Sequence, residues 1–182
     1  MSLLNSIKEL PLPGVKIASL ERFPDERGTF TEIMRKDWKE LLEGDSIAQV
    51  NLSITHPGII RAWHRHKRKQ VDYFLVLKGS LKVCIYDDQE NSPTKGHLVE
   101  AVLSEHKMQI LRVPGKYWHG LKVLGHEPAC LLYFVNNLYD YADPDEERRP
   151  WNDPNMIPAV INGKKADPRI GKPWDWNYLP HR

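Results

Sequence analysis

The chain has 182 residues, of which 41% are hydrophobic and 27% charged, and its formal net charge is +2 at pH 7. This length and composition fit one globular domain and exclude a disordered or fibrous protein, and so small a charge gives no reason to expect a nucleic-acid partner. No run approaches the roughly 18 consecutive apolar residues of a membrane helix. The first residues lack the layout of a secretory signal, so we expect a cytoplasmic protein with no membrane partner.

Short apolar or alternating runs, separated by turn residues, recur from the first third of the chain to residue 135. Runs at this spacing predict an antiparallel β-sandwich or barrel. In the stretch 35–45, Trp38 and Leu42 fall at helical spacing and Gly44 is a suitable stop, so we expect one short helix there. The ten expected strands are 15–20, 29–34, 47–54, 59–63, 71–77, 81–86, 98–103, 108–113, 120–124 and 129–135.

The character of the chain changes after Tyr141, where prolines recur so often that long helices and strands are excluded. Trp151, Trp174 and Trp176 are too apolar for a free tail, so we expect this segment to pack against the barrel. The prediction is therefore a single domain over residues 1–182, with a barrel core of about 15–140 and a C-terminal extension, 141–182, wrapped around it.

Two histidines stand one residue apart in the stretch IIRAWHRH. Regular strand alternation places His64 and His66 on the same face as Ala62, and places Arg61 and Trp63 on the opposite face. In a barrel, one of these faces lines an interior that can hold a ligand. The spacing therefore predicts that the two imidazoles point the same way, into a common site.

A third histidine, His119, follows PGKYW just before another expected strand, a position from which it can meet His64 at the mouth of a barrel. Two histidines at this spacing, a polar side chain soon after them and a later histidine can enclose a divalent ion. The pattern resembles the two motifs of metal-binding cupins, with the neutral amide of Gln70 in place of a carboxylate. A metal site of His64, His66, Gln70 and His119 is therefore kept as an alternative to a site without metal.

Five motifs in order extend the resemblance well beyond these histidines. The chain resembles the dTDP-4-dehydrorhamnose 3,5-epimerase family, which implies a mainly β, antiparallel cupin-like jelly-roll barrel, a homodimer and a dTDP-sugar substrate. No cofactor is implied, because the 4-keto group of such a substrate already acidifies the neighbouring protons. The motifs are FPDERGTFTEIM at 23–34, QVNLSITHPGIIRAWH at 49–64, GSLKVCIYDDQENSPTKGH at 79–97, LRVPGKYWHGLKVL at 111–124 and NLYDYADPDEERRPWNDP at 137–154.

The resemblance also implies roles for individual residues. His64 takes the role of the base that removes a proton next to the carbonyl, and an imidazole suits that task near pH 7. The acid is Tyr139 when the motif is counted forward from LLYF and Tyr141 when it is counted backward from WNDP, and we favour Tyr139. The positions that match substrate-binding residues of the family are Arg27, Phe30, Glu32, Gln49, Asn51, Arg61 and His119.

The chain departs from the family pattern at Asp72, where the family has a lysine that stabilises the developing enolate. A carboxylate there opposes enolate formation. Alternatively, it orients His64 or His66, because a carboxylate partner fixes the tautomer of an imidazole and raises its basicity. Other candidates for that orienting carboxylate are Asp167 and Asp175.

We therefore predict an isomerase that epimerises C3, C5 or both of a dTDP-4-keto-6-deoxy sugar, as in dTDP-rhamnose-type biosynthesis. Three alternatives remain. The run HRHKRKQVDYFLVLKGS also resembles dTDP-sugar 3,4-ketoisomerases, the histidines could make a metal-binding cupin, and Asp72 would suit a non-catalytic nucleotide-sugar binder.

Overall fold

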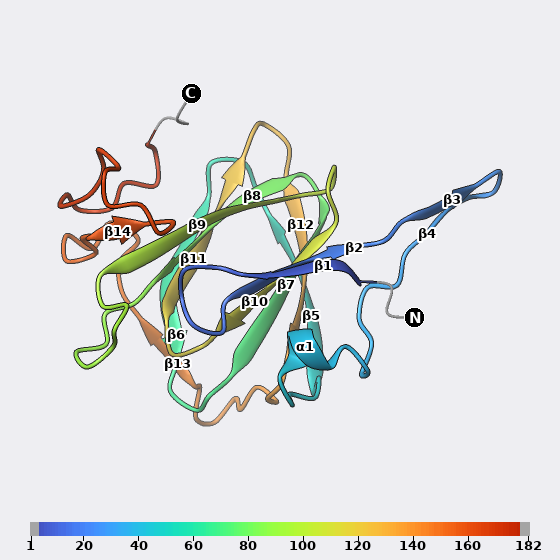
Figure 1. Ribbon diagram of the computed structural model, residues 1–182, viewed down its shortest axis with the longest axis horizontal. Helices are drawn as coiled ribbons and strands as arrows, with labels where there is room; N and C mark the ends of the chain where they lie inside the picture. Colours follow the sequence, from blue (N-terminus) through green and yellow to red (C-terminus); the bar gives the residue numbers. More distant parts are fainter. Residues whose placement is uncertain (1–3, 179–182) are drawn as a thin grey trace.

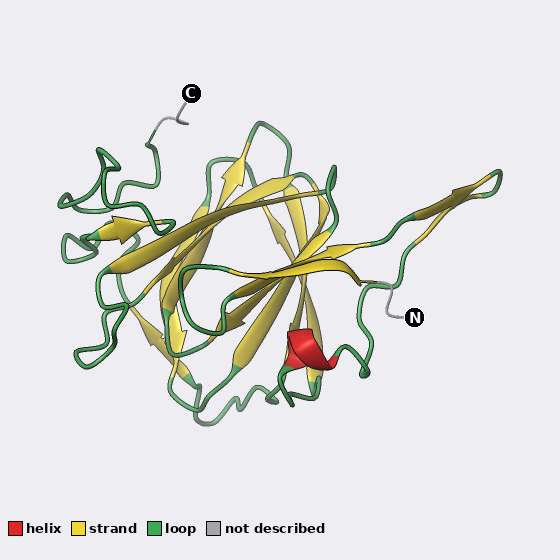
Figure 2. Ribbon diagram, in the orientation of Figure 1, coloured by secondary structure: helices red, strands yellow, loops and turns green. Residues whose placement is uncertain are grey.

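The structure is a computed structural model that describes residues 4–178, and this part of the chain is mostly β-strand with one short helix (Figures 1 and 2). The helix is α1 (Lys39–Leu42). The strands are β1 (Leu4–Glu9), β2 (Lys16–Leu20), β3 (Phe23–Asp25), β4 (Gly28–Phe30), β5 (Gln49–Thr55), β6 (Ile60–His66), β7 (Val71–Lys78), β8 (Ser80–Tyr86), β9 (His97–Ser104), β10 (Gln109–Pro114), β11 (Trp118–Leu124), β12 (Ala129–Val135), β13 (Glu146–Arg148) and β14 (Val160–Ile161). No helix among these residues is long and apolar enough to cross a membrane.

Within the described residues, the strands form two six-stranded sheets and a separate hairpin. One sheet has the order β1-β2-β10-β7-β12-β5 and the other has the order β13-β6-β11-β8-β9-β14. The pairs are antiparallel except for β14, which runs parallel to β9. This arrangement confirms the expected mainly β, antiparallel barrel with one short helix.

The main core lies between the two sheets. It joins Phe74 and Leu111 from the first sheet to Ile85 and Val123 from the second, and all four are buried. Alternation along the strands turns these apolar side chains inward, and β-branched and aromatic residues pack well on a pleated surface. The barrel is therefore filled by side chains over most of its length, which leaves room for a site towards one end.

A second apolar cluster covers the outer face of the first sheet. Trp38 and Leu41, at α1, pack with Tyr73 and Phe134 of β7 and β12. The predicted helix over 35–45 is reduced to four residues, because Glu43 already has a left-handed backbone with φ of 51°. Ile33 and Met34, expected in a strand, pack against this cluster instead.

A third cluster joins the outer face of the second sheet to the C-terminal segment. Trp63 and Trp118 of the sheet pack with Met156, Trp174 and Trp176. The ring centroids of Trp63 and Trp176 lie 4.8 Å apart. The C-terminal segment therefore packs on this sheet as expected, and Figure 1 shows it in orange to red, with its strand β14 beside β9.

The hairpin of β3 and β4 projects away from the barrel in Figure 1. The sequence suggested one longer strand, 29–34, but the ladder ends at Phe30. The salt bridge of Arg35 to Glu32, 2.8 Å long, and its bond to Asp37 hold the following residues in an irregular path. Strand β1 was not expected, because residues 4–9 show no regular apolar alternation in the sequence. In the structure its pairing with β2 shifts register between Leu4 and Ser6.

The SPTKG motif forms the turn between β8 and β9 around a fully buried carboxylate, Asp87. This carboxylate accepts hydrogen bonds from the hydroxyls of Ser92 and Thr94 and from the backbone N–H of Gln89. Burial acts to raise the pKa of Asp87, but these donors outweigh it and hold the pKa below its ordinary value of 3.8. The motif therefore has a structural role.

Candidate active site

Four ionisable side chains from three strands converge towards one end of the barrel. His64 and His66 come from β6, His119 from β11 and Asp72 from β7 of the opposite sheet. Strands β6 and β11 are paired so that His119 lies directly across from His64. Each of the four side chains has one nitrogen or oxygen that could bind a metal ion, and these four atoms lie within 4.8 Å of one another.

Asp72 is at the centre of this cluster and is 2% exposed. Its Oδ2 lies 3.2 Å from Nε2 of His66 and 3.2 Å from Nε2 of His119. Its Oδ1 accepts a hydrogen bond of 2.9 Å from the amide of Gln70. Of the two histidines that Asp72 was expected to orient, His64 and His66, it therefore contacts His66, and His119 is its second partner.

His64 lies near the Asp72 carboxylate, whose direct contacts are with His66 and His119. Its ring meets the ring of His119 edge-on, with centroids 4.1 Å apart. Burial lowers the pKa of His64 well below the ordinary value of 6.5, and the nearby His119 lowers it further. At pH 7 the imidazole of His64 is therefore neutral, which is the form that can accept a proton.

The pKa values of Asp72 and His66 shift in opposite directions. Burial acts to raise the pKa of Asp72, but the interactions with His119 and His66 outweigh it and hold that pKa well below 3.8. Burial acts to lower the pKa of His66, but Asp72 outweighs burial and raises it above 6.5. The cluster therefore keeps an ionised carboxylate in the barrel interior, and this carboxylate favours the protonated form of His66.

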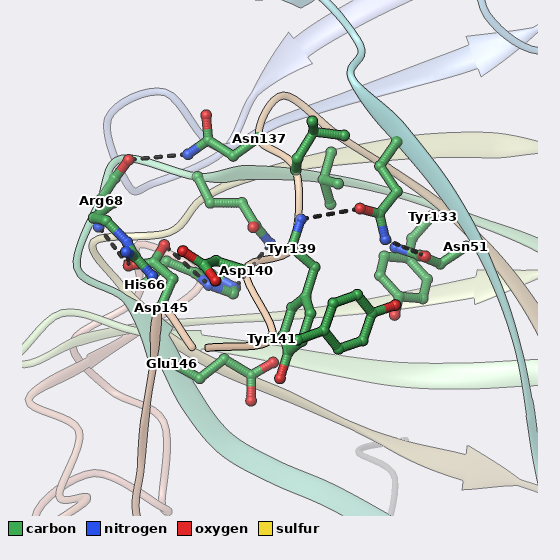
Figure 3. Close-up of a pocket in the computed structure, with 14 residues that line it drawn as sticks. Asn51, His66, Arg68, Tyr133, Asn137, Tyr139, Asp140, Tyr141, Asp145 and Glu146 are labelled. Atoms are coloured by element: carbon green, nitrogen blue, oxygen red, sulfur yellow. Dashed lines mark hydrogen bonds and ion pairs between the residues drawn. The ribbon is translucent and has the colours of Figure 1, made fainter. Parts of the chain in front are cut away.

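A cavity of about 420 Å³ opens onto this cluster. It adjoins a larger pocket of about 670 Å³, shown in Figure 3, and the two share His66, Gln70, Tyr133 and Glu146. His119 is fully buried behind this surface. The two hollows together give a concave surface large enough for a ligand with two distinct parts.

Tyr133 lines both cavities and was not identified as a site residue from the sequence. It lies on β12, where it pairs with Phe74 of β7 and Asn51 of β5. Burial raises the pKa of the Tyr133 phenol above its ordinary value of 10.0, so at pH 7 the phenol keeps its proton. Strand alternation through Leu131, Tyr133 and Val135 was the signal that could have identified it.

The sequence matches the family model described as dTDP-4-dehydrorhamnose 3,5-epimerase over residues 9–164. The chain belongs to the dTDP-4-dehydrorhamnose 3,5-epimerase family. It is 46% identical over 138 residues to a Haloferax volcanii protein named as a probable low-salt glycan biosynthesis epimerase, covering 76% of this chain and 87% of that protein. It is 37% identical over 142 residues to a spore coat polysaccharide biosynthesis protein of Bacillus subtilis, covering 78% of this chain and 91% of that protein.

A solved structure agrees with this assignment. The dTDP-6-deoxy-D-glucose-3,5-epimerase of Legionella pneumophila, in complex with dTDP-4-keto-L-rhamnose, matches with a TM-score of 0.75 and 26% identity. The match covers 88% of this chain and 89% of that one. The 3,5-epimerase family therefore accounts for the barrel as well as for the sequence motifs.

The two tyrosines suggested by the family motif lie on the wall of the larger pocket. Figure 3 shows their rings side by side, and the centroids of Tyr139 and Tyr141 are 5.0 Å apart. The backbone N–H of Tyr139 donates to the side chain of Gln49, which in turn donates to Asn51. Tyr141 is 89% exposed and Tyr139 is 42% exposed, so Tyr139 is the more enclosed of the two.

Arg61 lines the smaller cavity together with His64, and its Nε donates to Thr55 Oγ1 over 3.1 Å. The expected alternation brings His64 and His66 to a common site, but it fails over residues 61–63. Ala62 packs with Trp63 in the outer cluster, whereas the sequence placed these two residues on opposite faces and Arg61 away from His64. The pairing of β6 with β11 shifts register here, which breaks the regular alternation.

Three residues that match the 3,5-epimerase motif lie away from the histidine cluster of the same chain. Arg27 and Phe30 are on the projecting hairpin, where Arg27 pairs with Asp25 and Phe30 is 64% exposed. Glu32 forms a salt bridge with Arg35. The chain brings Gln49, Asn51, Arg61 and His119 to the site region, but not these three.

The acidic member of the cluster is Asp72, and Gln70, the amide of the alternative metal set, lies next to it. The amide of Gln70 donates to Asp72 and lies 3.2 Å from His66 Nε2. Asp167 binds Arg169 on the outer face, and Asp175 accepts a hydrogen bond from the backbone of Asn177. Among the described residues, the carboxylates that form ion pairs with these histidines are Asp72 and Asp145, not Asp167 or Asp175.

Proposed function

We propose that this protein epimerises C3, C5 or both of a dTDP-4-keto-6-deoxy sugar, within the biosynthesis of deoxysugars for polysaccharides. The single observation that carries the proposal is the neutral, desolvated imidazole of His64 on a cavity wall that also bears a phenol. Family membership and the names of the relatives, which include epimerases and polysaccharide biosynthesis proteins, support the same substrate class.

The chemistry needs a base on one face of the sugar and an acid on the other. Carbon atoms next to a 4-keto group carry acidified protons, and His64 would remove one of them to give an enolate. A phenol returns a proton from the opposite face and inverts the carbon. Tyr139 is our candidate for that acid, and Tyr133 is a second candidate because it lines the cavity of His64 itself.

The two hollows suit the two parts of a nucleotide sugar. We propose that Arg61, a cation on the wall of the smaller cavity, binds the pyrophosphate. The amides of Gln49 and Asn51 in the larger pocket offer hydrogen bonds to the nucleotide. In this arrangement the sugar lies against His64.

We also propose that the protein is a cytoplasmic homodimer. Strand β5 ends the first sheet and exposes an apolar row of Val50, Leu52 and Ile54, which are 51%, 61% and 59% exposed. An apolar edge strand of this kind favours pairing with a second chain. Leu52→Glu should therefore lower the molar mass measured by light scattering after size exclusion, whereas Leu138→Glu, at an exposed residue outside the row, should leave it unchanged.

Proton exchange tests the proposed reaction directly. In heavy water, the wild type should incorporate deuterium at C3 or C5 of a dTDP-4-keto-6-deoxy sugar, followed by NMR. His64→Ala should slow that exchange at least 100-fold, in line with the loss of a general base. His126→Ala, which removes an exposed histidine, is the matched control.

Unchanged exchange in a folded His64→Ala variant would exclude His64 as the base. The product distinguishes the reactions, since a 3,4-ketoisomerase moves the keto group whereas an epimerase leaves it at C4. Comparing Tyr139→Phe with Tyr133→Phe then assigns the acid: the correct variant loses inversion but keeps some exchange at the carbon that His64 deprotonates.

A further inference from the structure

Three potential ligand atoms in the histidine cluster face one another in an unusual way. Nε2 of His66, Nε2 of His119 and Oδ2 of Asp72 come from three strands, and the carboxylate oxygen lies 3.2 Å from each nitrogen. Four ordinary metal bonds of about 2.0 to 2.1 Å in a tetrahedron separate neighbouring ligand atoms by about 3.3 to 3.4 Å. The observed separations are therefore close to those of ligands around one ion.

The protonation of His119 is constrained from its other side. Its Nδ1 lies 2.9 Å from the backbone carbonyl of Tyr117. A carbonyl can only accept, so Nδ1 carries the proton. In the neutral ring, Nε2 then has a free lone pair, and this lone pair lies 3.2 Å from a carboxylate oxygen of Asp72.

Two acceptors at this distance repel each other unless a positive species binds both of them. A second proton on His119 would satisfy both atoms only through a hydrogen bond. Yet neither Nε2 of His119 nor Oδ2 of Asp72 has a hydrogen-bond partner of acceptable geometry among the described residues. Both atoms are buried, and such atoms are costly to leave without a partner. A cation away from the line between them can bind both lone pairs.

A carbonyl, carboxylate or amide also lies behind each potential ligand. His119 is fixed by the Tyr117 carbonyl, and Asp145 Oδ2 lies 3.6 Å from Nδ1 of His66. The amide of Gln70 donates to the other oxygen of Asp72. Metal-binding imidazoles commonly have a carbonyl or carboxylate at the second ring nitrogen, which keeps the first one free for the ion.

We propose that His66, Asp72 and His119 bind one divalent transition-metal ion. Two imidazoles and one carboxylate favour ions such as Zn²⁺, Fe²⁺, Co²⁺ or Mn²⁺ over Ca²⁺ and Mg²⁺, which prefer oxygen ligands. Three protein ligands leave at least one coordination position open. Because His66 and Asp72 line the cavity, that position faces the space available to a ligand.

His64 is not required as a ligand in this proposal. It lies against the ring of His119 and lines the same cavity, next to the position of the ion. Resting on the function proposed above, an ion here would polarise the 4-keto oxygen while His64 removes the neighbouring proton. Binding of the ion itself does not depend on that function.

Metal binding can be measured without any activity assay. The wild type as purified should contain about one equivalent of transition metal by elemental analysis. After treatment with a chelator, it should bind one equivalent of Co²⁺ with visible absorption bands typical of nitrogen and oxygen ligands, and Zn²⁺ should displace the Co²⁺. Substitutions His66→Ala, His119→Ala and Asp72→Asn should each weaken Co²⁺ binding at least tenfold. His126→Ala, the exposed histidine control, should bind Co²⁺ like the wild type.

Two further measurements keep the proposal testable where a substitution in the cluster prevents folding. Zn²⁺ at 100 times its Kd should raise the Tm of the chelator-treated wild type by about 5 °C or more, and Mg²⁺ should not. His64→Ala should lose proton exchange but keep the metal, which separates this proposal from the catalytic one. If the chelator-treated wild type binds neither Co²⁺ nor Zn²⁺, or if folded Asp72→Asn binds Co²⁺ as tightly as the wild type, the proposal is wrong.

Discussion

Gly115 lies directly beneath the histidine cluster, so the substitution Gly115→Ala tests how the site is supported. Its N–H donates to the carbonyl of Gln70 over 2.8 Å, and its carbonyl accepts from the N–H of His66 over 2.7 Å. A Cβ on Gly115 would lie 2.4 Å from the Gln70 carbonyl oxygen and 2.7 Å from the Cβ of His66. Both obstacles are at or next to the backbone, so a rotamer change does not relieve them.

The expected cost follows from two contributions. Pushing the Gln70 carbonyl away breaks a backbone hydrogen bond, for about 1 kcal/mol, and overpacking adds about 1 to 3 kcal/mol. The total is a loss of about 2 to 4 kcal/mol in the free energy of unfolding. With an m-value of about 2 kcal/mol/M, the urea midpoint followed by tryptophan fluorescence should fall by about 1 to 2 M.

The control is Gly58→Ala, at a residue with φ of +76° and open space around the position of a Cβ. It should cost about 1 to 2 kcal/mol from backbone strain alone and leave proton exchange unchanged. Gly115→Ala should also slow proton exchange, because displacing Gln70 and His66 moves the partners of Asp72. The reasoning fails if Gly115→Ala costs no more stability than Gly58→Ala, or if it leaves exchange at the wild-type rate.

Three further predictions concern binding and pH. Arg61→Met should weaken dTDP binding about 10- to 100-fold by calorimetry, which corresponds to the loss of a charged hydrogen bond. The control is Arg22→Met, at an exposed arginine. Equal dTDP binding by the two variants would exclude Arg61 as the phosphate ligand. Because the folded-state pKa of Asp87 lies below 3.8, its contribution to stability is full above that pH and is lost as pH falls below it. Urea midpoints of the wild type should therefore fall towards those of Asp87→Asn between about pH 5 and pH 2, and a pH-independent difference would contradict this. Burial raises the pKa of Tyr117, so its contribution is present below the unfolded value of about 10 and is lost as pH rises above it; Tyr117→Phe should show a smaller loss of Tm at alkaline pH, and parallel curves would refute it.

The sequence predicted the strands of the barrel better than the local irregularities and the helix. Long runs such as 71–77 and 129–135 correspond to β7 and β12, because their apolar side chains contact both the core and the neighbouring strands. Alternation failed at Ala62 and Trp63, where the strand changes register against β11. The length of α1 was overestimated because the same apolar residues that suggest a helix, among them Leu41, pack on the sheet from a single turn.

For the site, the motif brought out His64 and His119, and their proximity is confirmed. The role of Asp72 could only be settled in space, because it belongs to the opposite sheet and no local pattern links it to His119. Gln70 follows the histidines closely in sequence and was therefore the polar member of the alternative metal set. Tyr133 was overlooked for a similar reason, since its strand carries apolar neighbours and only cross-strand pairing brings it to the cavity.

The tryptophans of the C-terminal wrap have a consequence for how the chain folds during synthesis. Trp174 and Trp176 follow every strand of the sheet they cover, and they bury Trp63, Cys84 and Trp118 on its outer face. A growing chain that has already completed the barrel strands therefore still exposes an apolar patch until these late residues arrive. Partly folded chains with such patches aggregate readily, so the barrel depends on the rapid docking of its last segment as well as on its own core.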